Sequence, residues 1–240
     1  MASPMDQFAI KPIVPLSLGG FDVSFTNSAL FMLASVFIAS AFFISATRKR
    51  AMVPNAAQSM AEIAYKFVDG IIVENAGERG RVFFPYLFSI FLFVMMGNLL
   101  GLVPYGFTFT SHVAAVGALA LLGFFIGIIT GIRCQGWGFL HTFFPKGTPW
   151  VAAPVMIPIE IISYMSRPFS LTVRLVANMM VGHVMLKVVG GFIVMLGVFG
   201  VIPMLFAAAI LIFEMGIALL QAYIFTVLST VYLGDALKGH

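Results

Sequence analysis

Long apolar runs, separated by short polar breaks, dominate the chain from residue 28 onward. A helix needs about 20 consecutive apolar residues to cross the hydrocarbon core of a membrane. The runs over 28–47, 82–104 and 113–132 each have the length of one crossing. This pattern predicts three single membrane-spanning helices before residue 133.

Two further apolar runs, over 150–189 and 192–235, are too long for one perpendicular crossing of about 20 residues. Each must tilt strongly, kink or lie partly along the membrane. Gly190–Gly191 separates the runs and predicts a turn, and Pro203 is expected near the start of the second long helix. With this hairpin, the chain is expected to make about five crossings.

The segment over 56–75 has a different, amphipathic pattern. At about 100° per residue its polar positions share one face, and its apolar positions lie opposite. The polar positions are Gln58, Glu62, Lys66 and Asp69, and the apolar ones are Met60, Ile63, Phe67 and Ile71. This pattern predicts a helix at the membrane surface that serves as a structural strut, because its polar face mixes acids with a lysine.

The composition agrees with a membrane protein. Hydrophobic residues make up 61% of the 240 residues and charged residues 9%, with a mean hydropathy of +1.06, whereas soluble domains have about 25% charged residues. We expect one all-α polytopic membrane domain over residues 1–240. The basic residues collect in the polar breaks, so they indicate topology and not a nucleic-acid surface. They predict an outer N-terminus and a cytoplasmic C-terminus, which carries Lys238.

Cysteine and histidine usage favours neither a cofactor nor a metal. Cys134 is the single cysteine, and the histidines are His112, His141, His183 and His240. Two ligands on one helical face need a spacing of three or four residues, and no two of these histidines have it. A membrane enzyme with haem or a metal is therefore disfavoured, and no cofactor is expected.

A polar stripe interrupts the first long run. One helix face, at about 100° per residue, carries Ser163, Arg167, Ser170, Arg174 and Asn178. His183 points to the opposite side. An arginine at the centre of a membrane helix costs about 2.5–3.5 kcal/mol even on a lenient scale, so Arg174 is expected to have a functional role. Because its guanidinium stays charged at any working pH, Arg174 can act as a fixed cation but not as a proton relay.

The second long run carries its own polar face. Glu214, Gln221 and Tyr232 are spaced by seven and eleven residues, both close to whole numbers of helical turns. A hairpin could bring Glu214 and Gln221 near His183 and Asn178. With a turn at Gly190–Gly191, however, His183 lies seven residues before the turn and Glu214 lies 23 after it. A straight hairpin would not pair these two residues, so the register stays open.

The chemistry of these groups suggests an ion or proton pathway. Desolvation favours the protonated form of a carboxylic acid such as Glu214, and the imidazole of His183 exchanges protons near neutral pH. Ionisable residues inside a membrane indicate a transport pathway by default. The alternative is a secondary transporter or ion channel that uses Arg174 as a counter-charge. Transporters often have repeated halves with interrupted helices, and the sequence shows no such repeat.

Four ordered motifs carry a family resemblance. They are FVMMGNLLGLVPYGF at 93–107, IPIEIISYMSRPFSL at 157–171, SLTVRLVANMMVGH at 170–183 and ALLQAYIFTVLSTVYL at 218–233. In these motifs the chain resembles the subunit a family of F-type ATP synthases, in its alphaproteobacterial and mitochondrial branch. The resemblance covers about the last two-thirds of the chain.

The resemblance implies a mechanism. Subunit a is the stator beside a rotating ring of c subunits, and protons reach and leave a ring carboxylate through two offset half-channels. Arg174 matches the family's essential arginine, which separates the half-channels and attracts each deprotonated ring carboxylate. The two long helices are then expected to form a strongly tilted hairpin along the ring. ATP chemistry is expected on other subunits.

The resemblance also implies a proton path along this chain. The matching positions are Asn98, Asn178 and Gln221 for the outer half-channel, Glu160 and Ser170 for the inner one, and the titratable pair His183 and Glu214. Tyr232, on the face of Glu214, is added to the path as a prediction. The expected partners are the c-ring, b-type subunits of the peripheral stalk, the remaining synthase subunits and the lipid bilayer, without nucleic acid. The N-terminus lacks a transit peptide, which favours a bacterial plasma membrane over the mitochondrial inner membrane.

Overall fold

The computed structural model describes residues 8–15, 17–18, 21–22, 24–48, 53–103, 106–136 and 153–237. Some positions named in the sequence analysis lie outside these residues: His141, Lys238, His240 and 150–152 at the start of the first long run.

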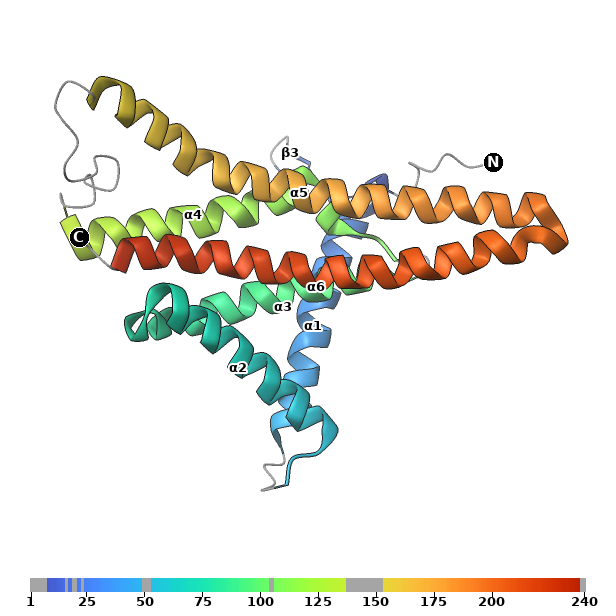
Figure 1. Ribbon diagram of the computed structural model, residues 1–240, viewed down its shortest axis with the longest axis horizontal. Coiled ribbons are helices and arrows are strands. Elements are labelled where there is room, and N and C mark those ends of the chain that lie inside the picture. Colours follow the sequence, from blue (N-terminus) through green and yellow to red (C-terminus); the bar gives the residue numbers. More distant parts are fainter. Residues whose placement is uncertain are drawn as a thin grey trace. The chain divides into compact units, whose positions relative to one another are not determined.

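Helices make up most of the described chain (Figure 1). The α-helices are α1 (Asn27–Arg48), α2 (Ala56–Ala76), α3 (Phe84–Gly101), α4 (Val113–Gln135), α5 (Ala153–Leu196) and α6 (Val201–Leu237). Short 3₁₀ helices are η2 (Glu78–Phe83), η3 (Phe109–Ser111) and η5 (Gly197–Gly200).

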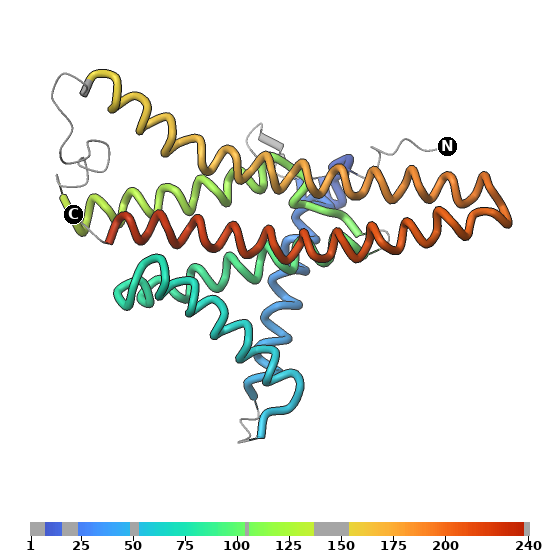
Figure 2. The backbone as a smooth tube through the Cα atoms, viewed as in Figure 1, coloured from blue at the N-terminus to red at the C-terminus, as the bar shows by residue number. Residues whose placement is uncertain are grey.

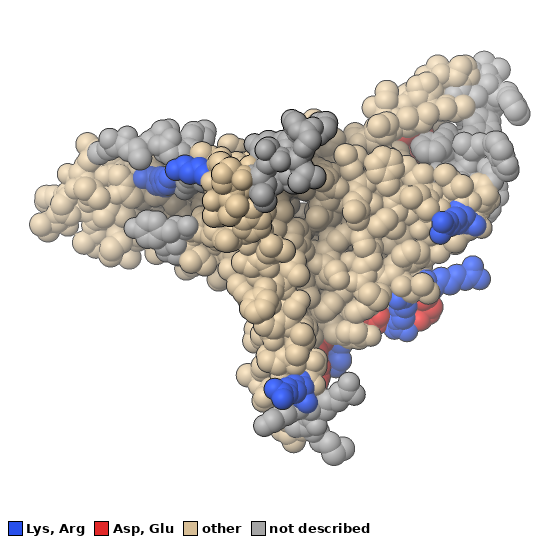
Figure 3. All heavy atoms as spheres, turned by 180° about the vertical axis from the view of Figure 1, so that it is seen from behind, with Lys and Arg blue, Asp and Glu red and all other residues tan. Residues whose placement is uncertain are grey.

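Four helical segments among the described residues are long and apolar enough to cross a membrane. They are Asn27–Arg48, Glu78–Gly101, Val113–Gln135 and the continuous stretch Pro154–Leu237, which contains α5 and α6. The all-α polytopic class is therefore confirmed. On the face drawn in Figure 3, charged side chains form a few small groups with uncharged surface between them, as expected for a protein solvated by lipid.

Two short antiparallel strand pairs, one nested inside the other in sequence, precede α1. The sequence analysis did not predict them. Strand β1 (Pro12–Val14) pairs antiparallel with β4 (Phe25–Thr26), and β2 (Ser17–Leu18) pairs with β3 (Phe21–Asp22). Strands this short leave little alternating pattern in the sequence, which explains why periodicity missed them.

The predicted turn at Gly190–Gly191 is wrong. Helix α5 continues through both glycines to Leu196, and the turn is η5, where Gly197 adopts a positive φ of 54° (Figure 2). Glycine is common in membrane helices, because without competing water the chain keeps its intrahelical hydrogen bonds. Pro203 lies in the first turn of α6, where its missing N–H leaves no helical bond unmade.

The chain folds as two compact units, each made of several chain segments. The first unit contains residues 1–48, 92–115 and 175–222. In it, the second half of α5 and the first half of α6 run antiparallel on either side of η5 (Figure 1). Buried side chains of this unit include Val94 and Asn98 of α3, Leu175 and Met179 of α5, and Ala218 and Ala222 of α6. Polar side chains, among them Asn98, Glu214 and Gln221, are thus buried together with apolar ones in this unit.

The second unit contains residues 49–91, 116–174 and 223–240. Its core includes an aromatic cluster of Phe124, Tyr164 and Tyr232, from α4, α5 and α6. Gly127 allows α4 to approach α6 closely, because a Cβ at this position would lie 3.0 Å from the Cβ of Tyr232. The side chain of Gln135 caps the end of α6 by donating to the carbonyls of Asp235 and Ala236, at 3.0 and 2.7 Å.

Helix α2 occupies the segment predicted as a surface helix, with ends within one residue of the prediction. Asn55 caps its start, since its Oδ1 accepts a hydrogen bond from the backbone N–H of Gln58 at 2.9 Å. Of the predicted apolar face, Ile71 is buried, whereas Met60 and Ile63 are exposed. The buried side of α2 instead carries Ala61, Val68 and Ile72, and the exposed apolar side chains of the helix suit contact with lipid. The position of α2 at the membrane surface stays a prediction.

Candidate functional site

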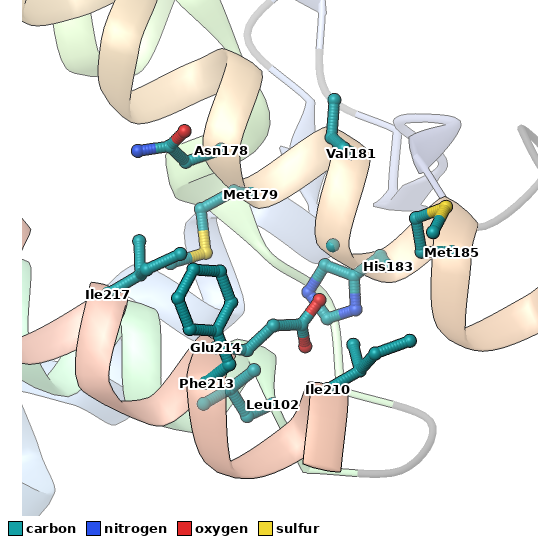
Figure 4. A pocket seen from close by; sticks show the side chains of 11 residues that line it. Leu102, Asn178, Met179, Val181, His183, Met185, Ile210, Phe213, Glu214 and Ile217 are labelled. Atoms are coloured by element: carbon teal, nitrogen blue, oxygen red, sulfur yellow. The ribbon is translucent and has the colours of Figure 1, made fainter. Parts of the chain in front are cut away.

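A cavity of about 310 Å³ lies in the first unit, between α5 and α6 (Figure 4). Its walls include Asn178, Gly182 and His183 of α5 and Phe213 and Glu214 of α6. Except for these few polar groups the lining is apolar, with methionine, leucine, isoleucine and phenylalanine side chains. The structure therefore brings three of the predicted proton-path residues, Asn178, His183 and Glu214, to one site.

Glu214 reaches into this cavity from α6. Only 7% of the residue is exposed, and neither carboxylate oxygen has a hydrogen-bond partner among the described residues. The carboxyl group lies against the backbone of Gly182, where a Cβ would overlap the carboxylate. A buried carboxylic acid without a partner is costly unless it binds or exchanges something, which makes Glu214 a functional candidate.

His183 enters the same cavity from α5. Its Nε2 and the Thr108 Oγ1 are hydrogen-bonded at 2.8 Å, and the imidazole tautomer decides which of the two atoms donates. Figure 4 shows the His183 and Glu214 side chains converging on the cavity from the two helices. This is the acid and imidazole pair that the family resemblance implied, with Thr108 as a third polar group that the sequence did not single out.

Two buried amides lie in the same unit but outside the cavity lining. Asn98 is fully buried, and its Nδ2 donates to the carbonyl oxygen of Ala218 at 3.2 Å. Its Oδ1 and the Oε1 of the buried Gln221 have no hydrogen-bond partner among the described residues. Each of these two amides leaves one buried oxygen without a partner among the described residues, which makes both side chains functional candidates.

The other predicted residues belong to the second unit. Arg174 and Ser170 are exposed, and Glu160 is half-buried. Arg174 makes no hydrogen bond or ion pair with any described residue, whereas Arg167 lies 3.9 Å from Asp235. Tyr232 is buried in the aromatic cluster, with its ring centroid 5.3 Å from that of Tyr164.

His112 is the one other described histidine. Its ring stacks on Phe107 with centroids 5.3 Å apart, and burial lowers the pKa of this imidazole below its usual value. Within the described residues, no group of three or more His, Cys, Asp or Glu side chains is arranged to hold a metal ion.

The sequence reasoning also missed Gly182, although it directly precedes His183. Replacing Gly182 with alanine is expected to displace the Glu214 carboxyl group, because overpacking of a fitted interior costs about 1–3 kcal/mol. The thermal midpoint of the purified complex and its proton conduction should both fall. Gly190→Ala is the matched control, since no atom lies within 4 Å of a Cβ there. Equal behaviour of the two variants would contradict the contact.

These features define a class of protein. The chain is a polytopic helical membrane protein that holds a carboxylic acid, an imidazole and two amides among apolar helices and carries an arginine on an apolar helix surface.

Comparison with known proteins gives the particular family. The family model described as ATP synthase A chain matches residues 29–234. The chain is 52% identical over 242 residues to the ATP synthase subunit a of Rhodospirillum rubrum, and 51% identical over 247 residues to that of Paramagnetospirillum magneticum, with complete coverage of both chains in each case. It is 48% identical to the subunit a of Mesorhizobium japonicum, over 98% of this chain and 96% of the relative.

The chain therefore belongs to the ATP synthase subunit a family, the proton-translocating membrane subunits of F-type ATP synthases. It is a multi-pass protein of the bacterial plasma membrane and works with other subunits of the synthase.

Proposed function

We propose that Arg174 is the barrier between two proton half-channels and the counter-charge for a carboxylate of a moving partner. The observation that carries this role is an exposed guanidinium on α5, without a hydrogen bond or ion pair to the described residues, on a stretch of the helix where Phe169 and Val173 are also exposed. A cation on an apolar membrane surface needs an anion from outside the chain. Because an arginine does not release its proton, it also blocks a direct proton shortcut.

The outer half-channel in this proposal runs through the cavity of His183, Glu214 and Asn178. A carboxylic acid and an imidazole in one wall can pass a proton between them, directly or through water, and Thr108 holds one ring nitrogen of His183. The buried and partly unsatisfied amides of Asn98 and Gln221 extend this polar path.

The inner half-channel in this proposal uses Glu160, Ser170 and Tyr232. Two features support it: Ser170 is exposed on the helix face of Arg174, and the buried Tyr232 hydroxyl has no hydrogen-bond partner among the described residues. A tyrosine hydroxyl in an aromatic cluster can donate to a water chain without carrying charge.

The partners in this proposal are a ring of c subunits and b-type subunits of the peripheral stalk. The supporting feature is the apolar surface of α6, where Ile202, Leu205 and Ile212 are more than half exposed. The whole chain acts as one membrane domain with an outer N-terminus and a cytoplasmic C-terminus. Arg133, in the last turn of α4, fits a cytoplasmic end of that helix.

Reconstitution separates this function from the transporter alternative. Vesicles that contain the chain together with c and b subunits are expected to conduct protons after an imposed potential, whereas the chain alone should not, because the proton carrier between the half-channels is the ring carboxylate. The measurement is the quench of an internal pH dye. Solute or ion flux through the chain alone, at a rate comparable to that of the assembled sector, would support the transporter or channel and contradict the proposal.

A further inference from the structure

The segment before the first strand is tied to the start of α1 by one side chain. Asn27 Oδ1 accepts a hydrogen bond from the backbone N–H of Lys11 at 3.2 Å, and its Nδ2 donates to the carbonyl oxygen of Ala9 at 3.1 Å. The backbone N–H of Asn27 also donates to the carbonyl oxygen of Lys11 at 3.1 Å. These bonds, together with the pairing of β1 and β4, hold residues 9–14 against the N-terminus of α1.

This anchored segment brings Phe8 to the candidate proton path. The Phe8 ring lies edge-on against the His183 imidazole, with centroids 6.2 Å apart and an interplanar angle of 68°. Thr108 is hydrogen-bonded to Nε2 of the same imidazole. Both Phe8 and His183 are half-buried, so the phenyl ring covers an imidazole that water would otherwise reach more freely.

We propose that Phe8 is a positioning residue for proton transfer, which restricts the rotation of the His183 ring and shields it from water, and that Asn27 holds Phe8 in place. The functional part of this inference rests on the proposed role of His183 in the outer half-channel. Edge-to-face packing favours one ring orientation, and the Thr108 hydrogen bond favours one placement of Nε2. Together they leave the remaining imidazole nitrogen directed to a defined site.

The shielding of His183 by Phe8 can be measured directly by chemical modification of the imidazole. Diethyl pyrocarbonate acylates accessible, unprotonated imidazoles, and trypsin cleavage after Arg174 and Lys187 yields the peptide over 175–187, whose single histidine is His183. In the assembled complex, Phe8→Ala is expected to raise the modification rate of His183 by about 2- to 10-fold, the change in population that loss of one aromatic pair can cause. Passive proton conduction should fall by a similar factor, because the imidazole spends less time in its productive orientation.

Three further variants sharpen this experiment. Phe8→Tyr keeps the ring and should restore both readings to those of the unchanged complex. Asn27→Asp keeps the acceptor for Lys11 but loses the donor to Ala9, so it should resemble Phe8→Ala in a milder form. Ile13→Ala is the matched control: it removes an exposed apolar side chain from the same segment and should change neither reading.

The outcomes distinguish the contact between Phe8 and His183 from the proposed role of His183 in the proton path. Faster His183 modification with slower proton conduction in Phe8→Ala, restored by Phe8→Tyr, supports it. An unchanged modification rate in both Phe8→Ala and Asn27→Asp overturns the proposal that Phe8 shields His183. Faster modification with unchanged conduction overturns the role of His183 in the proton path, while the contact itself stands. A change of modification in Ile13→Ala as large as that in Phe8→Ala shows general loosening and overturns the specific role of Phe8.

Discussion

Replacing Arg174 with alanine is expected to abolish ATP-driven proton pumping, with a loss of at least about 100-fold. A carboxylate of a moving partner that passes this surface would lose its compensating charge, and an unpaired charge in apolar surroundings costs about 3–5 kcal/mol. The Arg174 guanidinium is exposed and makes no ion pair with the described residues, so no internal salt bridge is lost with it. The measurement is the quench of a pH dye in vesicles that contain the rebuilt complex.

Two controls make the Arg174 result specific. Arg48→Ala removes a cation from the last turn of α1 and should leave pumping near its normal level. Arg174→Lys keeps a positive charge but loses the planar, permanently protonated group, so it should retain little activity. Normal pumping in Arg174→Ala would eliminate the proposed barrier.

Exchanging His183 and Glu214 should restore activity that either single change destroys. His183→Glu alone places two carboxylic acids in one cavity, and Glu214→His alone places two imidazoles there, so each leaves the path without its acid and base pair. Each single variant is expected to conduct protons about 100-fold more slowly, the lower end of what a positioned acid–base group contributes. The double variant should conduct faster than either single one.

The exchange is read as a double-mutant cycle of passive proton conduction in membranes from which the soluble part of the synthase has been removed. If the double variant shows the product of the two single losses, the residues act independently and the pair is not a functional unit. Exchange of Met185 with Ile210, two apolar residues of the same lining, is the control for disturbance of the cavity and should have a much smaller effect.

Local sequence information was sufficient for the bounds of the first two helices. The ends of α1 and α2 lie within one residue of the predicted segments 28–47 and 56–75. Membrane helices are this predictable because every backbone hydrogen bond must be made within the segment when the solvent is apolar. The length of an apolar run in the sequence therefore gives the length of the helix. The two short strand ladders before α1 depend on contacts between segments, and local periodicity did not indicate them.

The register of the α5 and α6 hairpin could not be obtained from sequence. His183 lies 14 residues before Gly197 and Glu214 lies 14 residues after Gly200, so a turn at η5 brings them opposite each other, whereas a turn at Gly190–Gly191 would not. The sequence of this region contains four glycines, Gly190, Gly191, Gly197 and Gly200, and glycine alone does not mark which of them makes the turn. Only the backbone conformation of Gly197, and the fit of Glu214 onto Gly182, distinguish between them.

The sequence by itself determined that this is a helical membrane protein with an arginine, an acid and an imidazole placed among apolar residues, because residue type and spacing are local properties. Only the tertiary structure decided which of these groups meet. His183, Glu214 and Asn178 share a cavity, Thr108 binds the imidazole, and Phe8 packs against it from a distant part of the chain. Such contacts depend on close packing between segments far apart in sequence. One added methyl group can prevent this packing, as at Gly182, where a Cβ would overlap the Glu214 carboxylate.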